Sequence, residues 1–245
     1  MFFFLHLLTG IVLGLLVADF LHDRRWVLPI AIGSVLPDLI DKPIGNLLFA
    51  DIFGNGRIFM HSLFIFCIFL LIGIVIWKRW AHPGLMALAL GLFSHQVLDL
   101  MWEDPKAWYF PLFGPFRYVQ GGDFAFLLLQ RDISIHSEWI LAIAMVVAFI
   151  LFLAFRQYGF LISRYQTVSA WLIGAGAVVF FLLSGATFVT GLVSATRTTA
   201  IFFRFFGWVE PVECIIGGIV FLLCAVLLWR MRSNLLKNGT IIFAP

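Results

Sequence analysis

The chain has 245 residues, of which 62% are hydrophobic and 12% are charged, and its mean hydropathy is +1.05. Soluble domains contain about 45–50% apolar residues, so this composition is typical of a polytopic membrane protein. The formal net charge of +3 comes from scattered residues that form no basic tail or stripe. Nucleic acid is therefore not an expected partner, whereas membrane lipid is.

About seven apolar segments are long enough to be membrane spans, and they cover residues 2–21, 27–50, 58–77, 84–102, 139–155, 168–196 and 211–229. The sequence therefore predicts an all-α polytopic membrane helical bundle with about six or seven transmembrane helices. The segment 27–50 contains Pro29, Pro37 and Pro43 with two aspartates, which predicts a broken or re-entrant element. Such an element is tolerated at membrane depth only where protein buries it or where it lines a wet cavity.

Chemically versatile side chains are concentrated in the first two thirds of the chain. After residue 165 there is no histidine, and Glu210 and Glu213 are the only acidic residues. We therefore expect residues 1–155 to form the functional membrane core. Residues 156–245 are expected to contribute C-terminal transmembrane helices that act as scaffold.

His95 and Asp99 form the strongest candidate pair, within the apolar stretch GLMALALGLFSHQVLDLMW. Their i, i+4 spacing places both side chains on one helix face. Imidazole and carboxylate are ordinary ligands for Zn²⁺ and similar divalent ions. Ionisable groups at membrane depth are rare and costly, which favours a functional role. The alternative is a buried, hydrogen-bonded His–Asp pair that braces two helices.

Two earlier motifs carry the same types of residue. In GSVLPDLIDKP, Asp38 and Asp41 are spaced to face one cavity; the alternative is an interfacial turn with solvated acids and Lys42 as counter-charge. In GRIFMHSLF, His61 opens the third apolar segment and is a candidate metal ligand. Arg57, one turn before it, could hold a phosphate or carboxylate of a substrate, or could contact a lipid headgroup.

Three further residues complete the candidate set. His6 lies at the start of the first segment, and His136 and Glu138 precede the fifth. His6 and His136 are candidate ligands, while Glu138 is a candidate ligand or general base. The sequence around the last two residues, QRDISIHSEW, is also compatible with a surface loop.

The basic residues suggest an orientation for these segments. Clusters follow the first, third, fifth and seventh segments, at Arg24–Arg25, Lys78–Arg79, Arg156 with Arg164, and Arg230 with Arg232 and Lys237. If all seven segments cross, these clusters share one side, which the positive-inside rule makes cytoplasmic. The other side also carries several basic residues, so the bias is incomplete. With this orientation every candidate ligand lies at a similar depth on the extracytoplasmic side.

The early His, the PDxxD motif, the GR…HS motif and the HxxxD motif together resemble the membrane-bound metal-dependent hydrolases. That family is also described as LexA-binding, inner-membrane-associated hydrolases. The resemblance covers about residues 1–155, and its most specific parts are LPDLIDKP, the Arg57–His61–Ser62 set and HQVLDLMW with the downstream PLFG. Gly56 and Met60 stand where commoner members carry His and Thr, a departure that resembles a variant branch common in archaeal sequences.

The resemblance implies a multi-pass protein of the inner cell membrane with a hydrolytic metal centre. Its order of His and acidic residues is remotely similar to the zinc-dependent phospholipase C and P1 nuclease group, which holds a cluster of zinc ions. That similarity implies Zn as the metal, with Mn as an alternative and two or more ions expected. It matches metal-ligand positions to His6, Asp38, His61, His95 and Asp99, with His136 and Glu138 roughly where the last ligands occur.

The function that this resemblance implies is a metal-dependent hydrolase acting on a phosphoester or a lipid-linked substrate. Asp38 or Asp99 would bridge metals, Asp41 or Glu138 would act as base, and Arg57 would bind the anion. Two alternatives belong to other classes. An ion or proton transporter would use the same residues as a cation site. A metal-stabilised membrane scaffold would hold the ion without turnover.

Overall fold

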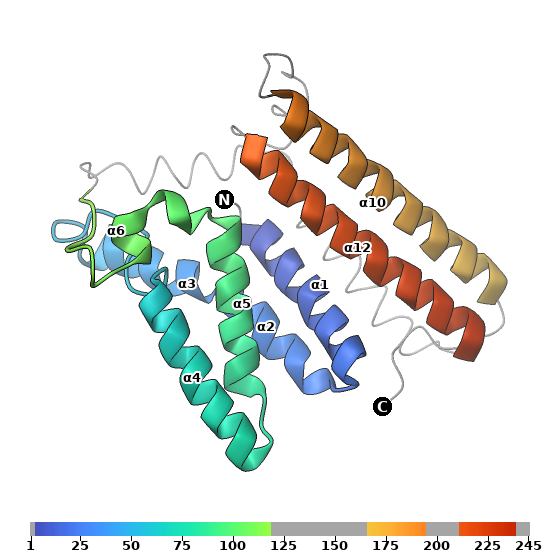
Figure 1. The fold of residues 1–245 in the computed structure, drawn as a ribbon, viewed down its shortest axis with the longest axis horizontal. Helices are drawn as coiled ribbons and strands as arrows, with labels where there is room; N and C mark the ends of the chain where they lie inside the picture. Colours follow the sequence, from blue (N-terminus) through green and yellow to red (C-terminus); the bar gives the residue numbers. More distant parts are fainter. Residues whose placement is uncertain (1–2, 119–165, 195–210, 239–245) are drawn as a thin grey trace. The chain divides into compact units, whose positions relative to one another are not determined.

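The structure is a computed structural model that describes residues 3–118, 166–194 and 211–238. Within these ranges the elements are all helical (Figure 1). Four of the described helices are long and apolar enough to cross a membrane: α1 (Phe3–Leu21), α4 (Leu63–Trp80), α10 (Gln166–Ser194) and α12 (Pro211–Asn238). These helices correspond to predicted segments 2–21, 58–77, 168–196 and 211–229. The predicted segment 139–155 lies outside the described residues, and the larger number of spans stays a prediction.

The chain divides into two compact units, which are described separately. Residues 1–18 and 23–134 form the first unit, and residues 19–22 and 135–245 form the second. The first unit holds nearly all of α1 and every described element up to residue 118. The second holds the α10–α12 pair.

The segment 27–50 is broken into three short elements in the first unit. After the 3₁₀ turn η1 (Arg24–Trp26) come α2 (Val27–Gly33), α3 (Leu36–Pro43) and the π-helical turn η2 (Ile44–Leu48). Pro37 lies in the first turn of α3, where its missing N–H costs no hydrogen bond. It also disfavours the helical conformation for the residue before it. These restrictions explain why α2 does not continue into α3.

Helices α4 and α5 are both displaced from their predicted bounds. Helix α4 begins at Leu63, because the Ser62 hydroxyl accepts a hydrogen bond from the N–H of Ile65 as an N-cap. The helix therefore begins later than the predicted segment 58–77, and His61 belongs to the turn before it. Helix α5 (Gly84–Leu98) ends before the predicted Trp102, and Asp99 is its C-cap.

The chain turns sharply after α5. Leu100 adopts the left-handed conformation with a φ of 53°, which ends the helical path. The 3₁₀ turn η3 (Met101–Glu103) and the short α6 (Pro105–Trp108) follow. The loop up to residue 118 then packs near the start of α4, through ring contacts described below.

Helices α2 and α5 pack with their backbones unusually close. A Cβ added to Gly33 would collide with the carbonyl group of Leu88, and one added to Gly91 would collide with that of Ile30. Ile30 and Leu92 are fully buried at this contact. The two glycines thus set the distance between the elements that carry Ser34 and His95.

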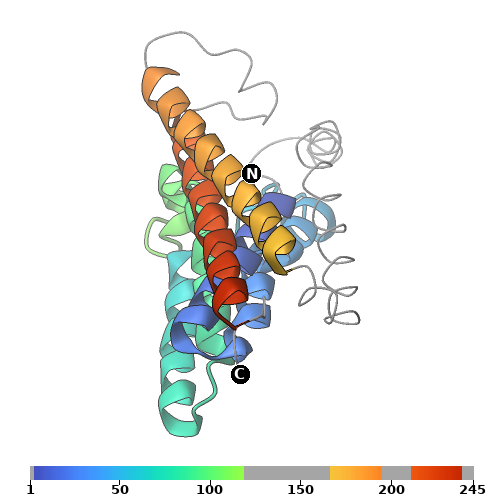
Figure 2. The same ribbon diagram turned by 90° about the vertical axis from the view of Figure 1, so that its right-hand side faces the viewer.

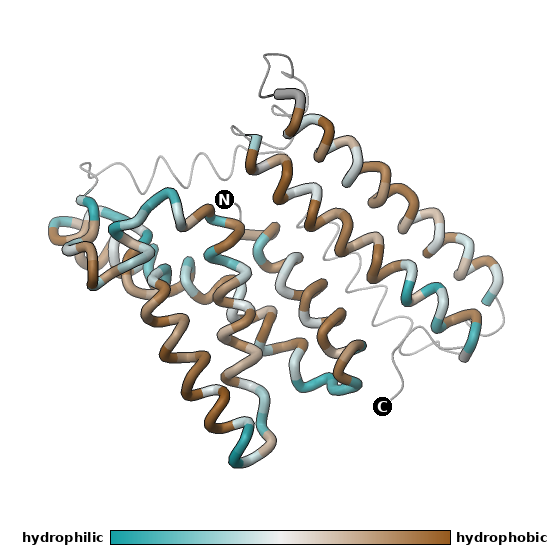
Figure 3. The backbone as a smooth tube through the Cα atoms, viewed as in Figure 1, coloured by the Kyte–Doolittle hydropathy of each residue, from teal (hydrophilic) through white to brown (hydrophobic). Residues whose placement is uncertain are grey.

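The first unit has two chemically different ends. The turns that contain Arg24–Arg25 and Lys78–Arg79 lie at one end, whereas the start of α4 and the end of α5 lie at the other (Figures 1 and 2). Helix α4 is hydrophobic along nearly its whole length between these ends (Figure 3). All candidate ligands described in this unit belong to the end away from the basic turns.

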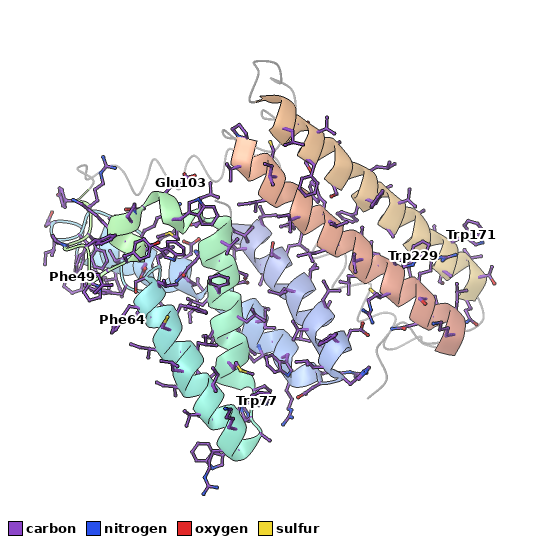
Figure 4. The ribbon with its side chains drawn as sticks, in the orientation of Figure 1. Phe49, Phe64, Trp77, Glu103, Trp171 and Trp229 are labelled. Atoms are coloured by element: carbon purple, nitrogen blue, oxygen red, sulfur yellow. The ribbon has the colours of Figure 1, made fainter. Side chains whose placement is uncertain are left out.

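The second unit is described as a pair of long apolar helices. Ser184 in α10 donates a 2.8 Å hydrogen bond to the carbonyl oxygen of Gly218 in α12. Gly218 also lies close against Thr187, so small residues let the two helices approach. Trp171 and Trp229 are exposed on this pair (Figure 4), and the Arg232 guanidinium lies 4.8 Å from the Trp229 ring centroid.

Candidate metal centre

Four buried side chains converge at one end of the first unit. Asp38 comes from α3, His61 from the turn before α4, His95 from the last turn of α5, and Asp99 from its C-cap. One ligand atom from each residue lies within 4.8 Å of all the others, and all four residues are buried. This group could hold a metal ion.

The spacing of the four ligand atoms fits a shared ion. The Nε2 of His61 lies 3.7 Å from Asp38 Oδ1 and 3.7 Å from Asp99 Oδ2. The Nε2 of His95 lies 3.8 Å and 3.9 Å from the same two oxygens. Ligands about 2.0–2.2 Å from a tetrahedral ion lie roughly 3.3–3.6 Å apart. The observed distances are close to this range and too long for direct hydrogen bonds.

The hydrogen bond made by Nδ1 of each histidine determines whether Nε2, which faces the cluster, carries a hydrogen. His95 Nδ1 lies 2.8 Å from the carbonyl oxygen of Ser34, and His61 Nδ1 lies 2.7 Å from Asp41 Oδ2. A carbonyl oxygen can only accept, and the Asp41 carboxylate already accepts from backbone N–H groups, so both Nδ1 atoms carry the hydrogen. In the neutral rings both Nε2 atoms therefore present lone pairs, and these nitrogens are 3.2 Å apart. Two lone pairs at this distance repel each other unless a metal ion or a proton lies between them.

Asp41 is the anchor of the turn that carries His61. Besides the imidazole, its carboxylate accepts hydrogen bonds from the backbone N–H groups of Ile58, Met60 and His61, at 3.0 to 3.2 Å. Asp41 is fully buried. A carboxylate that orients a metal-binding histidine in this way is a common arrangement in metal sites.

Two cations contact the carboxylates of the cluster. Lys42 Nζ lies 2.8 Å from Asp38 Oδ2, and an Arg57 guanidinium nitrogen lies 3.2 Å from Asp99 Oδ2. Their side chains are 40% and 37% exposed, whereas the carboxylates are almost completely buried. Lys42 and Arg57 therefore lie at the boundary between the cluster and the protein surface.

His6 lies beside the four-residue group. Its Nε2 is 3.1 Å from Asp99 Oδ1, and its ring centroid is 4.1 Å from that of His95. The Nδ1 of His6 and the Oδ1 of Asp38 are buried and have no hydrogen-bond partner in the described structure. Buried polar atoms are nearly always paired, so two orphans at one cluster point to a missing ligand.

Two supporting residues were not predicted from the sequence. Ser34 acts only through its backbone carbonyl, which leaves no signal in the side-chain pattern. Gln96 is buried, donates to the carbonyl oxygen of Ser62 at 3.1 Å, and accepts from Trp108 Nε1 at 3.1 Å. Its signal was a polar residue directly beside His95 in an apolar stretch. Gln96 links α5 to the start of α4 and to α6.

The structure brings together seven of the predicted site residues: His6, Asp38, Asp41, Arg57, His61, His95 and Asp99. Asp38 and Asp41 are buried, which excludes the alternative of a turn with solvated acids. The side chains of His95 and Asp99 are 3.9 Å apart and hydrogen-bond to other partners, so they are not a directly bonded brace. His136 and Glu138 lie outside the described residues.

The fold and the site define a multi-pass helical membrane protein with a buried His–Asp group that could hold a metal ion. Residues 1–162 match the family described as the YdjM inner membrane protein. This match covers more than half of the chain, so the protein belongs to the YdjM inner membrane protein family and is an integral protein of the inner membrane. No curated protein and no solved structure matches the chain significantly. The family description gives a location and no reaction.

Proposed function

We propose that this protein is an integral-membrane, metal-dependent hydrolase acting on a phosphoester. Asp38, His61, His95 and Asp99 would hold the divalent ion, with zinc as the expected metal and manganese as the alternative. The observation that carries the proposal is the pair of Nε2 atoms 3.2 Å apart, each left with a lone pair by its outer hydrogen bond. A cation between them removes the repulsion and also gives Asp38 Oδ1 a partner.

A divalent ion in such a site supplies an ionised water near neutral pH and polarises the bond to be cleaved. The residues of the chain provide the remaining functions. Lys42 and Arg57 are placed to bind an anionic substrate group at the edge of the cluster, because each is half-buried with its charge directed at a ligand carboxylate. The guanidinium of Arg57 offers two parallel donors to a phosphate.

We propose a positioning role for Asp41 in place of a general base. Its Oδ2 already accepts from three backbone N–H groups and the His61 ring, and its Oδ1 accepts from the N–H of Met60, so both oxygens are engaged within the turn. His6 is proposed as an additional ligand or as the residue that orients Asp99. A second ion would require His6 together with residues such as His136 or Glu138.

We also propose that the site opens toward the extracytoplasmic side. The turns with Arg24–Arg25 and Lys78–Arg79 lie at the end of the first unit away from the cluster. By the positive-inside rule, those basic turns face the cytoplasm. A reporter fused after Lys78 that is active only in the cytoplasm tests this orientation.

The metal content of the detergent-purified protein tests the central claim. We expect at least one tightly bound zinc or manganese per chain in the wild type and none in Asp38→Ala/His95→Ala. The matched control is Asp51→Ala/His82→Ala, which removes the same two residue types from exposed positions and should keep the metal. A folded, monodisperse wild type that takes up no metal when it is supplied would contradict the proposal.

Turnover is tested on the metal-loaded protein with a panel of soluble phosphomonoesters and phosphodiesters. We expect activity in the wild type and the exposed control, and its loss in Asp38→Ala/His95→Ala. Tight metal binding with no turnover on any ester would identify a metal-stabilised scaffold instead. Metal-dependent cation flux in liposomes, abolished by His95→Ala, would identify a transporter.

A further inference from the structure

Two loops near the candidate metal centre expose large apolar side chains, and neither belongs to a candidate membrane span. The first loop begins with the π-helical turn η2. Leu47, Leu48 and Ile52 are each about two-thirds exposed or more, and Leu112 and Phe113 of the second loop are also exposed. We call these five residues the apolar loop surface. Figure 4 shows the neighbouring Phe49 at the end of the first unit where α3 and α6 lie, with Trp77 at the opposite end of α4. Exposed apolar patches bordered by polar groups mark binding surfaces.

Aromatic contacts join the two loops into one structure. The ring of Phe116 lies 5.2 Å from that of Phe59 and is stacked 4.2 Å from that of Phe110. Phe53 contacts both Phe59 and Phe116. The Asn55 side chain also donates to the carbonyl oxygen of Arg117 at 3.1 Å. The loops are therefore held together by these contacts, while the five apolar residues remain exposed.

The same loops lead directly to the two cations at the cluster. Arg57 lies two residues before Phe59, in the turn anchored by Asp41. A Cβ added to Gly56 would lie 3.1 Å from Lys42 Cγ, so the Lys42 side chain passes beside this turn. Residues 42–61, from the end of α3 to the turn before α4, thus contain two half-exposed cations, three residues of the apolar loop surface and a candidate metal ligand.

We propose that the apolar loop surface binds the hydrocarbon part of an anionic amphiphile whose phosphate lies against Lys42 and Arg57. The ligand is a lipid phosphate rather than a free phosphate, because the cationic and apolar groups are complementary to its two halves. The assignment of the phosphate to this position rests on the proposed function. The assignment of the hydrocarbon to the loops rests on their exposure and their link to Arg57.

Two phosphate probes that differ only in chain length test this inference. Methyl phosphate and dodecyl phosphate are titrated into zinc-loaded protein in phosphatidylcholine nanodiscs, with empty nanodiscs as the blank. Because each fully buried methylene strengthens binding about fourfold, even partial burial of the chain predicts at least about tenfold tighter binding of dodecyl phosphate. Leu112→Ser/Phe113→Ser should lose most of this advantage and leave methyl phosphate binding unchanged.

Two further variants separate the cationic from the apolar contribution. Arg57→Gln should weaken both probes to a similar extent, because both carry the same phosphate. Leu71→Ser/Val75→Ser makes the same kind of change at exposed apolar positions of α4 and should affect neither probe. Equal affinity for the two probes would overturn the inference. An equal loss in the α4 variant would also overturn it, because the chain preference would then reflect general partition into the bilayer.

The result of this binding test can be distinguished from the result of the turnover test of the proposed function. A protein that holds metal and prefers dodecyl phosphate, but hydrolyses no ester, keeps the lipid site and loses the hydrolase assignment. A protein that hydrolyses soluble phosphoesters without any preference for a long chain keeps the hydrolase assignment and loses the lipid site.

Discussion

Buried polar groups are handled differently in the α10–α12 pair and in the first unit. In the pair, the hydroxyls of Ser184 and Thr187 are buried but donate to nearby backbone carbonyls, and none of the basic side chains described there is buried. In the first unit, six ionisable side chains are buried together: His6, Asp38, Asp41, His61, His95 and Asp99. Two polar atoms of this cluster, His6 Nδ1 and Asp38 Oδ1, have no hydrogen-bond partner in the described structure. A hydroxyl satisfied by a helix carbonyl only supports packing, whereas a cluster with unpaired buried polar atoms could hold an ion.

The largest difference between the two regions is expected at the anchor of the site. Asp41→Asn keeps the side-chain volume but replaces a charged carboxylate, whose Oδ2 accepts four hydrogen bonds, with a neutral amide. When the amide oxygen takes the place of Oδ2, the NH₂ group takes that of Oδ1 and faces the N–H of Met60. We expect unfolding free energy to fall by about 3 kcal/mol or more, and metal affinity to fall about 10–100-fold. Thermal unfolding in detergent and competition with a zinc chelator measure the two effects.

Ser184→Ala is the matched change in the second region and should cost no more than about 1 kcal/mol, because it removes a single neutral hydrogen bond. Similar losses in the two variants would show that the first unit is no more dependent on its polar cluster than the helix pair is on its hydroxyls. An unchanged metal affinity in Asp41→Asn would contradict the positioning role.

A smaller effect is expected at the link between α5 and α6. Gln96→Leu leaves the indole N–H of Trp108 without its acceptor and removes one of the two donors to the carbonyl oxygen of Ser62, which should cost about 1–3 kcal/mol of unfolding free energy. Thr187→Val, whose hydroxyl donates only within its own helix, should cost less than about 1 kcal/mol. Chemical unfolding of both variants, followed by tryptophan fluorescence, compares them. A larger loss of stability in Thr187→Val than in Gln96→Leu would contradict the difference between the two regions.

A last comparison concerns two glycines of opposite surroundings. A Cβ on Gly91 would collide with the α2 backbone, so Gly91→Ala should destabilise the protein by about 1–3 kcal/mol through overpacking. Nothing lies within 4 Å of a Cβ on Gly185 in α10, so Gly185→Ala should be neutral or stabilising by up to about 1 kcal/mol. Midpoints of thermal unfolding provide the comparison, and a destabilised Gly185→Ala would contradict it.

Sequence periodicity and hydropathy were sufficient for the long apolar helices. They placed α1 within two residues of its observed bounds and identified the break in segment 27–50 from its prolines. The errors arose where tertiary contacts override local pattern. His61 lies within the predicted segment 58–77, but in the structure Asp41, twenty residues earlier, holds its backbone in a turn. Asp99 reads as mid-helix, but the left-handed Leu100 that follows ends the helix there.

The candidate ligands were predictable because charged residues and histidines are conspicuous in an apolar chain. Which of these residues contact one another was not predictable. The pattern paired His95 with Asp99, whereas the structure pairs His95 with the carbonyl of Ser34, and Asp99 with His6 and Arg57. Backbone acceptors have no side-chain signature, and distant pairings depend on close helix approaches such as that of α2 and α5.

The length of helix α4 sets the depth of the site in the bilayer. The helix is apolar from Leu63 to Trp77, between the Ser62 cap and Lys78–Arg79, and only Gly73 of its 18 residues is buried inside the protein. At 1.5 Å per residue it is about 27 Å long, close to the roughly 30 Å of bilayer hydrocarbon. With its basic end held at one headgroup layer, the His61 turn reaches the other. The thickness of the bilayer relative to the length of α4 therefore sets the depth of the candidate metal centre. That depth decides whether a substrate reaches the centre from water, from the headgroup layer or from the acyl chains.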